Sequence, residues 1–276
     1  MPLIKKEKAV PLRGVQAKKR KRQRRRIFYL ALSGLLVSVA AVLTITLFFN
    51  VEHIEVKGDS IYSKEEIIDA TGIAFRSNMF KIDKFKVIAE TERILPYVQN
   101  VSIKRKLPTT MEITVEAAQN ASYVTTAGGF TILSEQDKVL ANVPEKPAVP
   151  ELIGSGIVAN NIGETAAFSS DFTKEMYDKL FLELKNAELL PRLSKIDITK
   201  SYNMSVEIEG KALVLIGPSE ELPRKISFLK FILSKEDISR SFSIIDISNT
   251  ESSRASVKTV TEEEYNAQLE KQKSTT

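Results

Sequence analysis

Three short motifs in the C-terminal half of the 276-residue chain contain residue types found in serine acyl enzymes. Ser227 and Lys230 are spaced as Ser-x-x-Lys, in which a lysine amine can activate the serine hydroxyl as a nucleophile. Ser201-Tyr202-Asn203 and Lys258-Thr259 supply two further parts, but Ser-x-Asn comes before Ser-x-x-Lys here, and Val260 stands where such enzymes have glycine. The order therefore favours side chains that flank a packed helix face over a catalytic set.

The composition gives little support to metal or cofactor chemistry. His53 is the only histidine and the chain has no cysteine, so a zinc site would lack its usual nitrogen and sulfur ligands. No glycine-rich loop opens a helix in the way that a phosphate-binding loop does. The sequence predicts a non-enzymatic protein with no catalytic residue, no cofactor and no metal site.

The most distinctive stretch is Ile27 to Phe49, 23 consecutive residues without a charged side chain. As an α-helix it would be about 34 Å long, enough to cross a hydrocarbon core of about 30 Å. The run is longer than the core of about 7 to 15 apolar residues in a cleaved signal peptide, and it ends in large residues. An uncleaved, single transmembrane helix is predicted at 27–49.

The charges on the two sides of this run are very unequal. Residues 1–26 hold twelve lysines and arginines and one glutamate, whereas the remainder holds 28 basic and 34 acidic residues. Positive charge favours the cytoplasmic side of a membrane, so the N-terminus is expected in the cytoplasm and the C-terminus outside the cell. Nucleic acid is not an expected partner, because the remainder is acidic and the basic run has no aromatic residue for base stacking. The residues expected to set topology and to contact membrane lipid are Lys18, Lys19, Arg20, Lys21, Arg22, Arg24, Arg25 and Arg26.

The segment after the span alternates between the patterns of strands and helices. Ser63 and Glu66 have the spacing of a capping box at the start of a helix, and Asp83 can cap a second helix that ends before Pro96. Two helices on one face of a three-stranded sheet would bury the apolar residues of all five elements. The predicted order is strand, helix, helix, strand, strand, at residues 51–57, 64–70, 84–95, 98–105 and 110–116.

This order, with the sequence ILPYVQNVSIKRKLPTTMEITVE at residues 94–116, resembles the POTRA domain of the FtsQ/DivIB family of bacterial cell-division proteins. Asn78-Met79-Phe80 followed by Asp83 also matches the family's pattern, whereas Glu116 is followed by Ala117-Ala118-Gln119-Asn120 where the family usually has Glu-Arg-x-Pro. The resemblance extends over residues 50–260. It implies a DivIB-like protein of a Gram-positive bacterium, with a basic cytoplasmic tail, one span, a POTRA domain beside the membrane and a second β-rich domain.

Residues 118–260 are expected to form this second domain, which is rich in β-sheet. Amphipathic helices are predicted at 171–190 and after Ser219, and a passage rich in proline and glycine at 143–163 is expected to be irregular. The strand-like segments are 122–126, 130–133, 138–141, 195–199, 204–208, 212–216, 242–247 and 254–260. The expected fold class is α+β, and the expected divisions are a basic cytoplasmic tail at 1–26, a transmembrane helix at 27–49, a POTRA domain at 50–117, a β domain at 118–260 and a disordered tail at 261–276.

The resemblance implies a scaffold function in cell division. Such a protein binds small bitopic partners similar to FtsB/DivIC and FtsL and helps to place the septal peptidoglycan synthase at the division septum of the cell membrane. Two other functions are compatible with the sequence. One is a membrane-tethered receptor or regulator that binds cell-wall material in a pocket of the β domain. The other is a penicillin-binding-type acyl enzyme that uses Ser227 and Lys230.

The expected docking site for the partners is the end of the β domain. Terminal strands expose unpaired backbone groups, to which a strand of another protein can add. Side chains of the last strand would alternate between its two faces, with Ala255, Val257 and Thr259 on one and the intervening residues on the other. The predicted partner-binding residues are Phe242, Ile244, Asp246, Ser248, Arg254, Ala255, Ser256, Val257, Lys258, Thr259 and Val260.

Overall fold

The computed structural model describes residues 13–154, 156–157, 161–200, 202–235, 238, 240–249 and 255–274, with the side chains of 13–23 and 273–274 outside the described part. The chain divides into two compact units. The first unit takes in the described part of Met1–Glu55 together with Gly72–Lys84 and Ile103–Ile113. The second takes in Val56–Thr71, Phe85–Ser102 and the described part of Thr114–Thr276.

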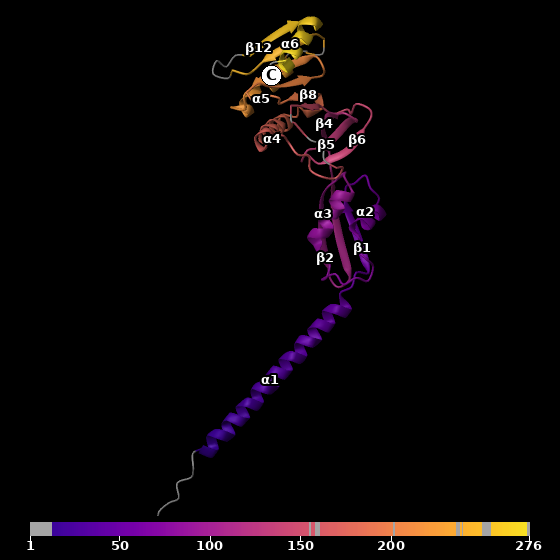
Figure 1. Cartoon of the computed structure of the whole chain (residues 1–276), viewed down its shortest axis with the longest axis vertical. Helices are drawn as coiled ribbons and strands as arrows, with labels where there is room; N and C mark the ends of the chain where they lie inside the picture. Colours follow the sequence, from indigo (N-terminus) through magenta and orange to yellow (C-terminus); the bar gives the residue numbers. More distant parts are fainter. Residues whose placement is uncertain are drawn as a thin grey trace, which may run out of the picture. The chain divides into compact units, whose positions relative to one another are not determined.

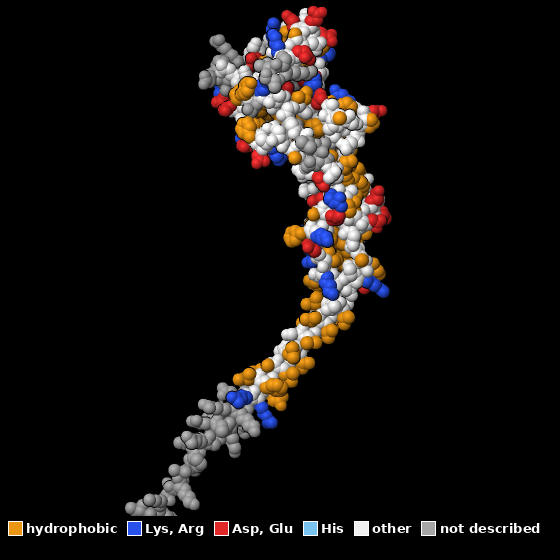
Figure 2. Space-filling model, in the orientation of Figure 1, with side chains coloured by type: hydrophobic (Ala, Val, Ile, Leu, Met, Phe, Trp, Pro, Cys, Tyr) orange, Lys and Arg blue, Asp and Glu red, His pale blue; other side chains and the backbone are white. Residues whose placement is uncertain are grey.

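A single long helix, α1 (Arg13–Phe48), begins the described chain (Figure 1). Its part Arg24–Phe48 is the one helix among the described residues that is long and apolar enough to cross a membrane, and this part is not buried inside the protein. Figure 2 shows apolar side chains along its length. Ser38 and Thr44 donate hydrogen bonds to carbonyls of the preceding helical turn, so these hydroxyls need no water.

The helix extends beyond the predicted span at its N-terminal end. The backbone of residues 13–26 is helical, although this stretch was expected only as a basic tail. Arg24, Arg25 and Arg26 are exposed next to the apolar run, as a topology signal requires. The side chains of Lys18, Lys19, Arg20, Lys21 and Arg22 lie outside the described part.

Five elements follow in the predicted order, each within about two residues of its predicted bounds. The helix α2 begins with the predicted capping box, in which Glu66 Oε2 accepts from the Ser63 backbone N–H at 2.8 Å and Ser63 Oγ accepts from the Glu66 N–H at 3.2 Å. The strands form a three-stranded sheet in the order β1-β3-β2. The elements are β1 (His53–Gly58), α2 (Lys64–Thr71), α3 (Lys84–Ile94), β2 (Val98–Lys106) and β3 (Thr110–Ala117).

The end of α3 is completed by a lysine that is distant in the sequence. In an α-helix the carbonyl of Glu92 would accept from the N–H of residue 96, but Pro96 has no N–H. The ammonium of Lys138 replaces it by donating to the Glu92 carbonyl, and it also donates to the Val98 carbonyl at 2.7 Å. Lys138 is only 6% exposed, and burial lowers the pKa of its ammonium to about 8.

A nine-stranded sheet occupies the remainder, in the order β12-β11-β10-β9-β8-β7-β4-β5-β6. The helices α4 and α5 cover its inner face, because Leu180, Leu184, Ile226 and Leu229 share one buried cluster with strand residues such as Val206. The elements are β4 (Asn120–Thr126), β5 (Gly129–Ser134), β6 (Val139–Val143), β7 (Glu151–Ile153), α4 (Asp171–Asn186), the 3-10 turn η1 (Leu190–Arg192), β8 (Leu193–Asp197), β9 (Met204–Ile208), β10 (Ala212–Gly217), α5 (Leu222–Lys235), β11 (Phe242–Asp246), β12 (Ser256–Val260) and α6 (Glu262–Ser274). The α+β fold class is confirmed.

Three local predictions are wrong. Residues 262–274 are not a disordered tail, because they form α6 behind a capping box in which Thr261 and Glu264 exchange backbone-to-side-chain hydrogen bonds. The passage expected to be irregular contains β7, which pairs in parallel with β4 and β8. Ser219 does not cap α5, because Glu221 has a φ of 53° and the helix begins only at Leu222. The predicted boundary between residues 117 and 118 falls between the two sheets and stays a prediction.

Candidate partner-binding edge

The two strands expected to bind partners lie at one end of the nine-stranded sheet. β11 pairs in parallel with β10 on one side and in antiparallel with β12 on the other. The antiparallel register places Phe242 opposite Val260, Ile244 opposite Lys258, and Asp246 opposite Ser256. β12 is the terminal strand, and among the described residues no further strand pairs with its outer side.

The register determines which backbone groups of β12 face outward. Ser243 N–H donates to the Lys211 carbonyl and Ile247 N–H to the Leu215 carbonyl, so the odd-numbered residues of β11 direct their backbone toward β10. Phe242, Ile244 and Asp246 must then direct theirs toward β12, where they meet the even-numbered residues. The backbone N–H and C=O groups of Val257 and Thr259 therefore point away from the sheet.

The outer face of this end is covered by α6. Phe242, Ile244 and Val260 belong to a small apolar cluster with Tyr265 of that helix, and the rings of Phe242 and Tyr265 are 5.0 Å apart. Tyr265 is 2% exposed, and burial, together with the nearby Glu207 carboxylate, raises the pKa of its hydroxyl. Three predicted contact residues are thus under the protein's own helix or beside it.

The remaining predicted residues divide by environment. Asp246 Oδ1 accepts from the Ser248 N–H at 2.9 Å and from its hydroxyl at 2.7 Å, so these two side chains shape the turn after β11. Ala255 packs partly against the main core. Ser256, Val257, Lys258 and Thr259 are exposed, Val257 to 43%. Arg254 lies outside the described residues.

Two of the other sheet edges are protected. Beside β6, the Val139 N–H donates to the Glu164 carbonyl and the Gly163 N–H donates to the Val139 carbonyl, so a loop pairs with the first residue of that strand. Beside β2, Val101 N–H donates to the Glu92 carboxylate at 2.9 Å, and Lys84 Nζ donates to the Ile103 carbonyl at 2.8 Å. Coverage of this kind prevents unwanted strand pairing.

The fourth edge, β1, carries His53, Glu55 and Lys57. Charged side chains on an edge oppose the addition of another strand. β12 carries a single charged residue, Lys258, whose backbone groups face β11, and it has valine and threonine at its outward-facing backbone positions. Among the described edges, β12 is therefore the one best suited to strand addition.

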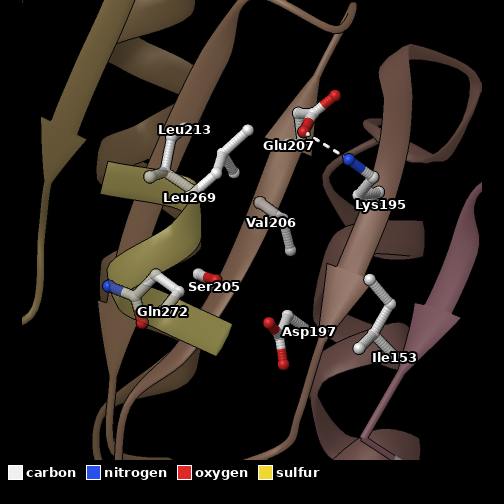
Figure 3. A pocket seen from close by; sticks show the side chains of 9 residues that line it. All are labelled: Ile153, Lys195, Asp197, Ser205, Val206, Glu207, Leu213, Leu269 and Gln272. Atoms are coloured by element: carbon white, nitrogen blue, oxygen red, sulfur yellow. Dashed lines mark hydrogen bonds and ion pairs between the residues drawn. The ribbon is translucent and has the colours of Figure 1, made fainter. Parts of the chain in front are cut away.

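A small hollow lies where α6 crosses the sheet (Figure 3). Leu269 and Gln272 of the helix face Leu213, Val206 and Ser205 of the strands, and beyond them Lys195 Nζ lies 3.1 Å from Glu207 Oε2. The hollow measures about 20 Å³, which is room for about one water molecule. It is too small for a sugar or a peptide, so a ligand of that size could contact only the surface of this region.

The acyl-enzyme motifs are not brought together by the described structure. Ser227 and Lys230 lie on α5 beside a hollow of about 280 Å³, and Lys230 Nζ is 3.4 Å from Glu188 Oε2. Asn203 instead donates to Gln272 of α6, and Lys258 lies on the edge strand opposite Ile244. Ser201 lies outside the described residues.

Larger hollows do occur elsewhere in the β domain. One of about 400 Å³ is lined by Asp137, Lys174 and Phe181, and one of about 500 Å³ is lined by Asn203, Lys225 and Ser248. Their volumes are in the range of small-molecule sites, but polar, charged linings differ from the mainly apolar linings of such sites.

The element of this region that the sequence prediction missed is α6. The signal was present in the chain, because Thr261 and Glu264 have the spacing of a capping box and Tyr265 and Leu269 lie one helical turn apart. Two large apolar residues in a highly polar stretch were too few to distinguish a docked helix from a solvated one.

Comparisons with known proteins show similarity to cell division proteins. A family model described as the POTRA domain, FtsQ-type, matches residues 49–116. Cell division protein DivIB of Clostridium botulinum (strain Hall) is 24% identical over 229 residues, which are 82% of this chain and 88% of that protein. Cell division protein FtsQ of Corynebacterium glutamicum is 26% identical over 209 residues, 74% and 89% of the two chains, and FtsQ of Geotalea daltonii is 24% identical over 185 residues, 67% and 66%. The chain is therefore similar to DivIB and FtsQ cell division proteins over most of its length, and its residues 49–116 match the FtsQ-type POTRA domain.

Proposed function

We propose that this protein is a non-enzymatic scaffold of the division machinery that captures partner proteins by strand addition to β12. The partners are bitopic division proteins similar to FtsB/DivIC and FtsL, through which the septal peptidoglycan synthase is organised. α1 crosses the cell membrane once, with the basic N-terminus in the cytoplasm and both folded parts outside, at the division septum. The charge difference across the apolar run supports this orientation.

The observation that carries the proposal is the open edge of β12. The backbone groups of Val257 and Thr259 face outward, and the described residues provide them with no strand partner. A partner strand would gain hydrogen bonds there without displacing any pairing of the host sheet. Ser256 and Lys258 place their backbone groups toward β11, so they hold the edge strand in position.

Proline substitution tests this directly. Val257→Pro removes an outward N–H but leaves the β11–β12 ladder intact, so the fold should survive while partner binding is lost. Val257→Thr is the matched control, because it keeps the N–H and the branched shape, and it should bind as the wild type does. Binding is measured with the full chain in nanodiscs and the purified extracellular segments of the DivIC-like and FtsL-like proteins.

A second variant separates pairing from folding. Lys258→Pro removes an inward N–H and should weaken the β11–β12 pairing itself, which far-ultraviolet circular dichroism and thermal unfolding would report. If Val257→Pro unfolds as the wild type does and still binds the partner segments with unchanged affinity, strand addition at β12 is refuted.

A further inference from the structure

Several large apolar side chains of the first unit are exposed in spite of a well-packed neighbourhood. Phe75 is 67% exposed, Phe80 46% and Leu107 58%. Arg76 and Lys81 are exposed in the same loop as the two phenylalanines. Figure 2 shows apolar and basic side chains next to the end of the long helix. Apolar and basic groups together on one surface are typical of contacts with membrane lipid.

The loop is fastened to the last turn of α1. Asn78 Nδ2 donates to the Ile45 carbonyl at 2.8 Å, and the Met79 N–H donates to the Phe49 carbonyl at 3.0 Å. The rings of Phe49 and Phe80 meet edge to face with centroids 5.3 Å apart. Carbonyls in the last turn of a helix lack a helical donor, so the loop supplies the hydrogen bonds that the end of the span requires.

Phe80 is positioned by its neighbours Met79 and Arg105. Met79 is completely buried, and its carbonyl accepts from Arg105 Nε at 2.8 Å. The guanidinium of Arg105 also lies over the ring of Phe80, 5.5 Å from its centre. The Thr109 carbonyl accepts from the Glu52 N–H at 2.8 Å, which brings the β2–β3 turn, with Leu107, to the residues just after the span.

These contacts fix the depth of the loop relative to the bilayer. If α1 spans the membrane, its C-terminal turn lies at the boundary between the acyl chains and the headgroups. A loop that hydrogen-bonds to Ile45 must then lie at the same boundary. At this depth the rings of Phe75 and Phe80 are transferred from water into the headgroup region. Arg76 and Lys81 can then contact lipid phosphates.

We propose that Phe75, Phe80 and Leu107, with Arg76 and Lys81, form a second membrane contact that enters the headgroup region of the outer leaflet. The ligand is the phospholipid surface itself, and anionic headgroups strengthen the contact. This inference rests on the proposed insertion of α1.

The chain contains no tryptophan, so single tryptophans can report on each position. The full chain carrying Phe75→Trp is reconstituted into vesicles of phosphatidylcholine and phosphatidylglycerol, with bromine atoms placed near the headgroup end of the acyl chains. We expect a blue-shifted emission, quenching by the brominated lipid and loss of quenching by aqueous acrylamide. Leu107→Trp should behave in the same way. Replacing phosphatidylglycerol by phosphatidylcholine should reduce the quenching by lipid.

Two control positions make the outcomes distinct. Phe231→Trp, on α5 at a side chain 58% exposed, should be quenched by acrylamide and not by brominated lipid. Leu36→Trp, in the middle of the apolar run, should be quenched by deeply placed bromines if α1 is inserted. Quenching at Leu36→Trp with none at Phe75→Trp and Leu107→Trp overturns the second contact and leaves the span intact. No lipid quenching at Leu36→Trp would overturn the insertion of α1.

Discussion

Replacing Lys138 by methionine separates two opposing effects on stability. Lys138→Met keeps the length and the apolar stem of the side chain but removes the ammonium that bonds the carbonyls of Glu92 and Val98. Leaving two buried acceptors without this donor costs about 1–3 kcal/mol each. Against this, removing a buried charge relieves a desolvation cost of about 3 kcal/mol, since burial lowers the pKa from 10.5 to about 8 and each pKa unit is worth about 1.4 kcal/mol. At pH 7 the variant should therefore be less stable by no more than about 3 kcal/mol.

The pH dependence gives the sharper test. Between pH 8 and 10.5 the unfolded chain holds a proton on Lys138 that the folded chain has lost, so the stability of the wild type rises with pH in this window. The Glu92 carboxylate opposes the shift by favouring the charged form. The unfolding free energy of the wild type minus that of Lys138→Met should therefore increase by about 2 kcal/mol from pH 7 to pH 9.5.

Urea unfolding of the full chain in detergent micelles, followed by circular dichroism at several pH values, measures this difference. Lys179→Met is the matched control, because it removes an exposed ammonium from α4. If the difference in unfolding free energy between the wild type and Lys138→Met stays constant from pH 7 to 9.5, folding does not lower the pKa of the Lys138 ammonium. The account of Lys138 as a desolvated replacement for the missing N–H of Pro96 would then be wrong.

Two further predictions concern the β domain. Leu184→Ala, at a fully buried position of α4, should lower the unfolding free energy by about 2–5 kcal/mol in urea. Leu182→Ala, at a position of the same helix that is 54% exposed, should stay within about 0.5 kcal/mol of the wild type, and equal losses for the two would contradict the assigned core. Thr261→Ala should destabilise α6 by about 1 kcal/mol, because it removes the hydroxyl that accepts from the Glu264 N–H. Hydrogen exchange should then be faster in α6 but unchanged in β9, and unaltered exchange in α6 would show that the cap contributes nothing.

Of the two strands of the candidate edge, β11 could be predicted because one of its faces is buried, whereas β12 is exposed at residues 256–259. Ile245 is completely buried while its neighbours face the opposite side, and this alternation is visible in the sequence. The outward direction of the Val257 backbone could not be predicted in the same way. It depends on the register with β11, and through β11 on the hydrogen bonds with β10, which are tertiary properties.

Short or polar elements were missed for a related reason. β7 has only three residues, and its pairing partners come from distant parts of the chain, so local pattern carries little of its stability. α6 is polar except for Tyr265, Ala267 and Leu269, and its position depends on the apolar patch that Phe242 and Val260 offer. The capping box of Ser63 and Glu66 predicted the start of α2 correctly, whereas the same spacing at Thr261 and Glu264 did not lead to a predicted helix.

The hydrogen bonds of Asn78 to the end of α1 have a mechanical consequence. Val51 N–H donates to the Ser77 carbonyl at 2.9 Å, so the chain leaves the helix directly into a bonded loop without a slack linker. The apolar part of α1, residues 27–48, has 22 residues and is about 33 Å long, so in the proposed topology it would tilt in a bilayer whose core is about 30 Å thick, and the tilt would change with bilayer thickness. Because the loop at residues 75–81 is hydrogen-bonded to the last turn of α1, a change in bilayer thickness that alters the tilt of the helix would also alter the orientation of this loop at the membrane surface.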